Sequence, residues 1–319
     1  MLISFILRCV RNISLPAIVL LLAACATPPM QPFGSDILIW DSTAKKMITS
    51  EQLTDRSRSA DFVLIGETHD NPIHHRIQQS MLTAISANDR RPTLVMEQFD
   101  FEQQTVIDSA MSANTSRVDA LKILQKEMAR GWDWPQYRPL IEIAKDRSLP
   151  LKAANLSRIR LQQVSRLGFD ALGDNAAARL ALDAGWSDAQ QKQLEKDIVE
   201  GHCGMLAAAA AAPIVNAQRA RDAMMADTLL QVGSAPAIAI LGRGHVRRDL
   251  AVPLYLAARA PKRIAIVLGL VDFDEGQMPG NEALNAMAGR YDYVVMTPAV
   301  KRNKNLCDGL VMPAMPAAK

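Results

Sequence analysis

The sequence predicts an α/β fold whose parallel sheet is interrupted by a group of helices. Two short apolar runs, residues 62–65 and 237–241, end in the same pattern, in which a histidine stands three positions after a glycine. Such runs are typical of strands buried inside a parallel sheet. Helical patterns alternate with strand patterns along most of the chain, whereas residues 155–232 contain helical patterns only. We therefore expect one α/β domain with a helical insertion before its second Gly-x-x-His strand.

The first 24 residues have the layout of a signal peptide. Arg8 and Arg11 precede an apolar run, small residues follow it, and the segment holds no acidic residue. The segment Leu22-Ala23-Ala24-Cys25 is similar to the lipobox of bacterial lipoproteins, which implies cleavage before Cys25 and acylation of that residue. The alternative is an uncleaved N-terminal anchor, although the apolar run is short for a membrane span.

The residue after Cys25 indicates where such a lipoprotein would be sorted. Ala26, rather than an aspartate, stands at this position, and in lipoproteins that choice is associated with the outer membrane. We expect a lipid anchor on the periplasmic face of a bacterial outer membrane. Residues 25–49 are then a lipidated tether, of which 26–36 are rich in Pro, Thr and Gly and stand outside the fold. The predicted domain spans residues 50–298, and residues 299–319 form a C-terminal tail.

Composition restricts the classes of partner. Cleavage would remove two of the 36 basic residues and none of the 33 acidic ones, which leaves a net charge of +1. This charge predicts no nucleic-acid partner. Of the four cysteines, only Cys203 and Cys307 would stay free to form a disulfide in an oxidising periplasm, and their sequence positions do not decide whether they pair.

The elements of the domain follow from local patterns. After the first strand, an Asx cap and Pro72 start a helix that continues to residue 85. A strand at 93–96 delivers Glu97 to the carboxyl edge of the sheet, and a helix at 135–145 precedes a weaker strand at 149–153. The insertion contains helices at 156–167, 175–183, 188–199 and 205–230. Beyond the strand at 237–241, further strands are expected at 263–268 and 291–296.

Four side chains are expected to meet where the strands end, because open α/β folds bind ligands at the carboxyl edge of the sheet. They are Glu67, His69, Glu97 and His245. Imidazole nitrogens and carboxylate oxygens suit zinc, iron or manganese, so His69, His245 and Glu67 could hold a divalent metal that activates water for hydrolysis. Alternatively, the glutamates orient the histidines, or Glu67 caps a helix and Glu97 pairs with an arginine.

Two further groups indicate an anionic, planar ligand. Arg243, Arg247 and Arg248 surround His245, and guanidinium groups bind carboxylates, although a solvated basic loop explains them equally well. Residues 132–139 hold two of the four tryptophans together with Tyr137. This aromatic segment is either a plug of the core or a flat wall with Tyr137 as a ligand to ferric iron.

These motifs together resemble the ChaN-like haem-binding lipoproteins, in a superfamily that also includes the Tiki/TraB proteins and erythromycin esterases. The resemblance covers about residues 50–298 and rests on six segments: 66–70, 96–97, 132–139, 201–205, 217–225 and 242–245. It implies a three-layer α/β domain with helices on both faces of the sheet and an inserted all-helical subdomain. It also implies a lipoprotein that binds haem during iron acquisition.

The same resemblance implies how the ligand is held. Haem would lie between two subunits, with a tyrosine on iron and a histidine near the propionates, which makes Tyr137, Arg243, His245 and His202 the candidate haem-binding residues. A homodimer formed with ligand and delivery to haem transport machinery are expected partners. The Tiki branch implies the alternative, a metal-dependent hydrolase that uses both Gly-x-x-His motifs, with His69 and His245 at their ends.

Overall fold

The computed structural model describes residues 33–300 apart from 35, 89, 129–130, 184, 208–209 and 274–278. The predicted signal peptide, Cys25 and nearly all of the predicted C-terminal tail lie outside the described residues. Cys203 is disulfide-bonded. Cys307, with which the sequence suggests that it could pair, also lies outside them.

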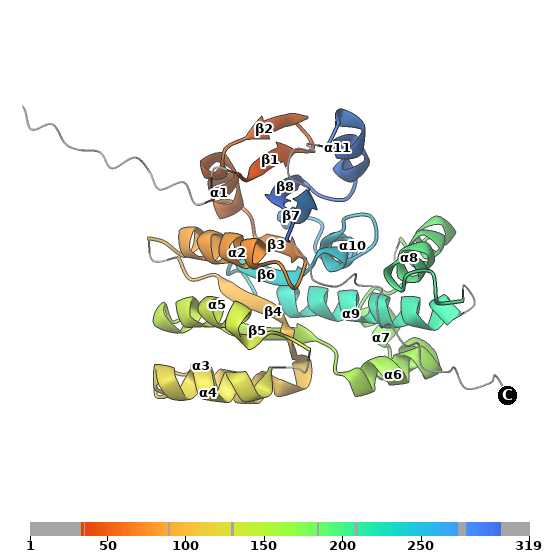
Figure 1. The fold of residues 1–319 in the computed structure, drawn as a ribbon. Coiled ribbons are helices and arrows are strands. Elements are labelled where there is room, and N and C mark those ends of the chain that lie inside the picture. The colour runs from red at the N-terminus through yellow and green to blue at the C-terminus, as the bar shows by residue number, and fades with distance from the viewer. Residues whose placement is uncertain are drawn as a thin grey trace, which may run out of the picture. The chain divides into compact units, whose positions relative to one another are not determined.

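An eight-stranded sheet in the order β2-β1-β8-β7-β3-β6-β4-β5 forms the middle of the fold (Figure 1). The central strand β3 pairs in parallel with both β6 and β7, as a run of branched aliphatic residues buried on both faces requires. The strands are β1 (Leu38–Asp41), β2 (Lys46–Ile48), β3 (Phe62–Glu67), β4 (Thr93–Asp100), β5 (Leu151–Asn155), β6 (Ala237–Gly242), β7 (Ala265–Phe273) and β8 (Tyr293–Pro298).

Two strands at one end of the sheet correct the predicted tether. Residues 38–48 form β1 and β2, and β1 pairs antiparallel with β8, with Leu38 opposite Met296. The sheet is therefore mostly parallel rather than wholly parallel, and the domain begins before residue 50. The sequence analysis missed these strands because they are only four and three residues long.

Helices cover both faces of the sheet, so the predicted three-layer α/β fold is confirmed. Alternate residues of β3 point to opposite faces of the sheet. Val63 and Ile65 join the core on one face, and Phe62 and Leu64 join the core on the other. The first core is covered by α1 (Ser50–Arg58), α2 (Pro72–Ile85), α3 (Gln104–Met111), α4 (Arg117–Glu127) and α5 (Trp134–Asp146). The second is covered by α6 (Arg158–Leu167), α7 (Ala176–Arg179), α9 (Ala211–Gln231), α10 (Val252–Arg259) and α11 (Asn281–Ala288).

The helices between β5 and β6 belong largely to the second layer. Helix α9 begins only at Ala211, after the predicted start at 205, and its buried side chains, including Met225, join the core on the sheet. Helix α8 (Asp188–Gly201) packs instead on the first turns of α9, through a small separate core that contains Ile198 and Val215. This packing leaves α8 beside the carboxyl edge of β6. Within the described residues, no helix combines the length and apolar character that a membrane crossing needs.

Candidate functional site

The parallel register brings the ends of β3, β6 and β4 together. Glu67 lies opposite Gly242, and the Gly242 N–H donates to Glu97 Oε2 at 2.6 Å. A Cβ added to Gly242 would lie 2.9 Å from His69 Cε1, 3.0 Å from His69 Nε2 and 3.4 Å from Glu97 Oε2. A side chain at position 242 would therefore displace the His69 ring, because that ring and the Glu97 carboxylate both approach the Gly242 backbone.

His245 reaches the same carboxylate from the short 3-10 turn η4 (Arg243–Val246). Its Nε2 lies 3.4 Å from Glu97 Oε1, and its Nδ1 lies 2.6 Å from Asp222 Oδ1 on α9. His69 and His245 thus gather at one carboxylate, as the sequence predicts. Burial lowers the pKa of His245, but the charges of Glu97 and Asp222 outweigh burial and raise that pKa above its ordinary 6.5.

Glu97 is nearly fully buried, and its negative charge compensates the positive charge of the His245 imidazole. Burial raises its pKa, yet the charges of His245, His69 and Arg221 outweigh burial and hold the pKa below its ordinary value. A buried ion pair of this kind is costly to break, because either partner alone would be an uncompensated charge.

Glu67 lies in a second, connected network under the site. It accepts hydrogen bonds from the Tyr137 hydroxyl at 2.6 Å and from Gln78 Nε2 at 2.5 Å, and His69 Nδ1 lies 3.0 Å from it. The Trp132 ring meets His69 edge-on, with centroids 4.5 Å apart. The aromatic segment therefore plugs the core and fixes the position of His69.

This arrangement corrects the predicted metal site. Within the described residues, no group of three or more His, Cys, Asp or Glu side chains is placed to hold a metal ion. Glu67 is satisfied by Tyr137 and Gln78, and both ring nitrogens of His245 face carboxylates. A divalent metal at His69, His245 and Glu67 is therefore not supported.

Tyr137 is also placed differently from the prediction. Its side chain is fully buried, and burial together with the neighbouring Glu67 carboxylate raises the pKa of its phenol well above 10. A buried phenol that donates to Glu67 is not positioned to ligate haem, so Tyr137 is assigned to the buried network.

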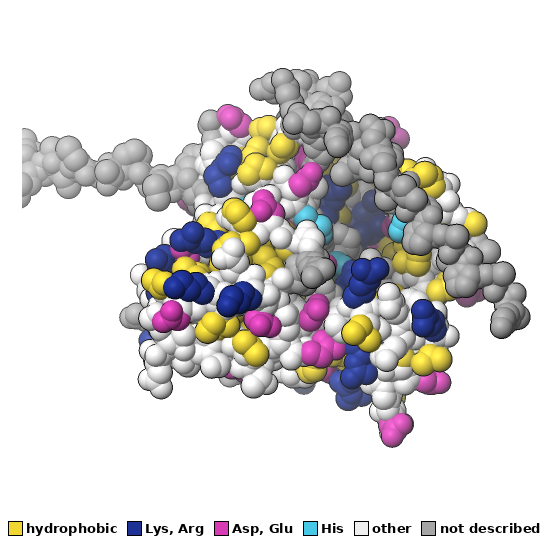
Figure 2. Space-filling view, turned by 60° about the horizontal axis from the view of Figure 1, so that its bottom comes forward, with side chains coloured by type: hydrophobic (Ala, Val, Ile, Leu, Met, Phe, Trp, Pro, Cys, Tyr) yellow, Lys and Arg dark blue, Asp and Glu magenta, His cyan; other side chains and the backbone are white. Residues whose placement is uncertain are grey.

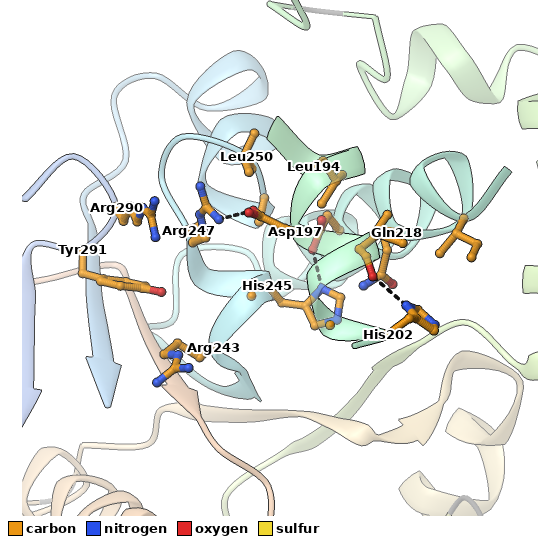
Figure 3. A pocket seen from close by; sticks show the side chains of 16 residues that line it. Leu194, Asp197, His202, Gln218, Arg243, His245, Arg247, Leu250, Arg290 and Tyr291 are labelled. Atoms are coloured by element: carbon orange, nitrogen blue, oxygen red, sulfur yellow. Dashed lines mark hydrogen bonds and ion pairs between the residues drawn. The ribbon is translucent and has the colours of Figure 1, made fainter. Parts of the chain in front are cut away.

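A pocket of about 420 Å³ opens on the other side of His245 (Figure 3). This volume falls within the range of roughly 300–1,000 Å³ that is usual for small-molecule sites. Figure 2 shows histidine side chains around a hollow on one face, with Lys and Arg side chains nearby. The apolar part of the pocket lining consists of Leu194, Ile198, Ile214, Leu250 and Ala251. The polar lining includes His202, Arg243, Arg247, Arg290 and Tyr291.

The arginines of the predicted cluster have different roles. Arg247 forms ion pairs with Asp197 and Asp249, and Arg248 pairs with Asp292 at 2.5 Å. Arg243 and Arg290 line the pocket and form no ion pair with a carboxylate among the residues that the structure describes. Arg243 Nη1 donates only to the Leu270 carbonyl, at 3.4 Å, so both guanidinium groups keep donors for an anionic ligand.

The sequence analysis did not identify Asp222, Arg290 or Tyr291 as functional candidates. Asp222 lies on a helix with no local signal of its role, and Arg290 and Tyr291 directly precede the last strand. The Tyr291 ring packs against Gly269, where a Cβ would approach it to 2.6 Å. Figure 3 shows its hydroxyl turned into the pocket. Burial raises the pKa of Tyr291, while the charges of the three pocket arginines oppose that rise.

Comparison with known proteins identifies the family and the fold. Residues 53–256 match the family described as haem-binding uptake, Tiki superfamily, ChaN. The structure described as cofacial heme binding to ChaN of Campylobacter jejuni is similar, with a TM-score of 0.67 and 20% identity, over 82% of this chain and 97% of that one. A structure of the erythromycin esterase EreC, in its open conformation, has a TM-score of 0.45 and 11% sequence identity. The match covers 81% of this chain and 95% of that one. No curated protein sequence matches significantly.

Proposed function

Because the chain belongs to the ChaN family of haem-binding uptake proteins, in the Tiki superfamily, we propose that it binds haem in the pocket beside His245. The observation that carries this proposal is the pairing of an apolar wall with Arg243 and Arg290. Haem has a flat apolar ring and two propionates, and guanidinium groups bind carboxylates through paired hydrogen bonds. The residues present therefore fit the group.

Tyr291 replaces Tyr137 as the tyrosine proposed to meet the iron. The other three tyrosines do not line this pocket, whereas the Tyr291 hydroxyl faces into it (Figure 3). The charges of the pocket arginines oppose the rise that burial gives to the pKa of Tyr291, and the phenolate is the form of tyrosine that binds ferric iron. His245 stands next to the arginines, in agreement with a histidine near the propionates.

The proposal also includes a membrane anchor and the pairing of two chains. The lipobox-like segment ending at Cys25 supports an acylated anchor on the periplasmic face of the outer membrane, because several acyl chains together hold a protein on a bilayer. Cofacial heme binding in the Campylobacter jejuni protein supports a pair of haem-loaded chains. From such a pair, haem would pass to transport machinery.

Titration of haemin into the full chain, solubilised in detergent, tests the proposal. We expect a saturable Soret change, together with a shift from monomer to dimer in sedimentation velocity. Arg243→Ala and Arg290→Ala should each weaken binding about tenfold or more, since each removes charged hydrogen bonds. Arg166→Ala, an exposed arginine of α6 outside the pocket, is the matched control. A flat titration of the wild-type chain would refute the proposal.

Hydrolysis is a second candidate, favoured by the 2.6 Å contact between His245 and Asp222. A protonated histidine held by a carboxylate can act as a general acid without a metal. Ester or peptide hydrolysis that survives a chelator and disappears in His245→Asn would support it, whereas equal rates in both chains would exclude it.

A further inference from the structure

One side of helix α9 forms part of the pocket lining. Ile214, Gln218 and Asp222 follow one another at intervals of four residues, so they lie on the same side of the helix, and all three line the pocket. Asp222 is bonded to His245 Nδ1, and Ile214 is apolar. Gln218 lies between them and is half-buried (Figure 3). It is the polar side chain of this row that the His245 network does not use.

A hydrogen bond from Arg221 decides which way the Gln218 amide is turned. Arg221 Nη1 donates to Gln218 Oε1 at 3.0 Å. A guanidinium group can only donate, so the amide oxygen must be the atom that faces Arg221. Within the part of the chain that the structure describes, Gln218 Nε2 donates to no other residue. The NH₂ group is therefore what this side chain can offer to a ligand in the pocket.

The neighbouring Arg221 also makes the Gln218 amide a better donor. Hydrogen bonds in a chain polarise one another, so an amide whose oxygen accepts from a cation donates more strongly from its nitrogen. Glutamine achieves this without adding a negative charge to a pocket whose lining already contains Asp197 and Asp222. An uncharged donor at this position therefore suits an anionic ligand.

We propose that Gln218 is a specificity-determining residue, which donates from Nε2 to a propionate of the bound haem. The inference rests on the proposed haem binding, and it adds a neutral donor from the helical insertion to the guanidinium groups of Arg243 and Arg290. A donor fixed before binding gives specificity, because a ligand that lacks the matching acceptor leaves it unpaired. This contact is at the edge of the ring, so it leaves one face of haem to the proposed tyrosine and the other to the second haem of the proposed pair.

Gln218→Glu tests the donor while the contact with Arg221 is kept. The glutamate carboxylate still accepts from Arg221, but it cannot donate, and its charge repels a propionate. Haemin should therefore bind the full-length variant, solubilised in detergent, about tenfold or more weakly than it binds the wild-type chain. Haemin dimethyl ester has no charged propionate, so its affinity should fall by only about threefold or less. The preference of the chain for haemin over the ester should fall accordingly.

The control is Gln162→Glu, the same exchange at an exposed position of α6, which should change neither affinity. An equal loss for both ligands would assign Gln218 to the support of the pocket alone, and an unchanged preference would show that it makes no contact with a propionate. Either result overturns the inference and leaves haem binding intact. If the wild-type chain binds no haemin, the proposed function fails as well.

A measurement on the wild-type chain needs no variant. With ¹⁵N-labelled glutamine, the side-chain NH₂ resonances of Gln218 should shift when gallium protoporphyrin, a diamagnetic analogue that keeps both propionates, is added to saturation. Gallium protoporphyrin dimethyl ester should shift them less. Resonances that stay in place with both compounds, although both bind, would overturn the inference.

Discussion

The chemistry of individual residues at this site is governed by buried carboxylates. Glu67 and Glu97 are 2% and 3% exposed, and a buried carboxylate is tolerated only where hydrogen bonds or opposite charges compensate it. Glu67 obtains that compensation mainly from neutral donors, including Tyr137, whereas Glu97 obtains it from His245 and from the Gly242 N–H. Neighbouring glutamates therefore have different roles: one fixes His69, and the other balances a charged imidazole.

Replacement of two tyrosines should separate a structural role from a binding role. Tyr137→Phe removes a donor from buried Glu67, so we expect a loss of about 1–3 kcal/mol in unfolding free energy with an unchanged haemin spectrum. Tyr291→Phe should weaken haemin binding and alter the spectrum at nearly constant stability. Denaturant unfolding and haemin titration of both variants check this, and a reversed pattern would restore Tyr137 as the ligand.

The raised pKa of His245 predicts how stability depends on pH. A folded pKa above the unfolded value of 6.5 gives a stabilising contribution that is complete below pH 6.5 and is lost as pH rises through the folded pKa. Unfolding free energy measured from about pH 6 to 9 should therefore fall with rising pH. Asp222→Asn should flatten this slope, because the variant lacks one of the charges that raise the pKa. NMR titration of His245 at or below 6.5 would contradict this prediction.

At the scale of elements, features set by local sequence signals were predicted better than features set by contacts between distant segments. The Asn71 cap and Pro72 start α2 as expected, since the Asn71 side chain accepts from the Ile73 N–H. The convergence of His69, Glu97 and His245 followed from strand order and glycine turns. The pairing of Asp222 with His245 did not, because no pattern in α9 tells which of its polar residues faces β6. Strand β1 was missed because it is short and its partner β8 lies near the far end of the domain sequence.

Two glycines at strand ends should respond differently to alanine. At Gly66 a Cβ would meet Val246 Cγ2 at 2.2 Å and the Arg243 backbone at 3.0 Å, so we expect a loss of about 1–3 kcal/mol or more. At Gly242 it would meet the His69 ring, which is 47% exposed and can swing outward. Gly242→Ala should thus cost less stability but break the contact between His69 and Glu67. Thermal unfolding of both variants and the NMR shifts of His69 measure these effects, and a larger loss in Gly242→Ala would refute the account.

For the whole molecule, the pocket lies where the sheet meets its helical insertion. Helices α8 and α9 supply His202 and Asp222, while the segments next to β6 and β8 supply Arg243 and Tyr291. Neither the sheet nor the insertion alone contains the apolar wall and the cationic groups. Ligand binding should therefore stabilise the contact of α8 with the sheet edge.

The proposed lipid anchor can be tested apart from the pocket. Cys25→Ser should move the protein from the membrane fraction to the soluble periplasmic fraction, because the acyl chains would be absent. The variant should bind haemin as tightly as the wild-type chain, since the pocket lies in the folded domain. Fractionation with immunodetection tests this, and an unchanged membrane fraction for Cys25→Ser would point to the uncleaved anchor instead.

The antiparallel contact of β1 with β8 has a consequence for biosynthesis. β1 leaves the ribosome first among the described strands, yet it pairs with the last of them to be made. The central strand β3 must likewise wait for β6 and β7, because Phe62 pairs with Ala237 and Ala265. Contacts so distant along the chain slow folding and leave strand edges open meanwhile. We therefore expect the strands of the nascent chain to keep unpaired edges until the final strand has been synthesised.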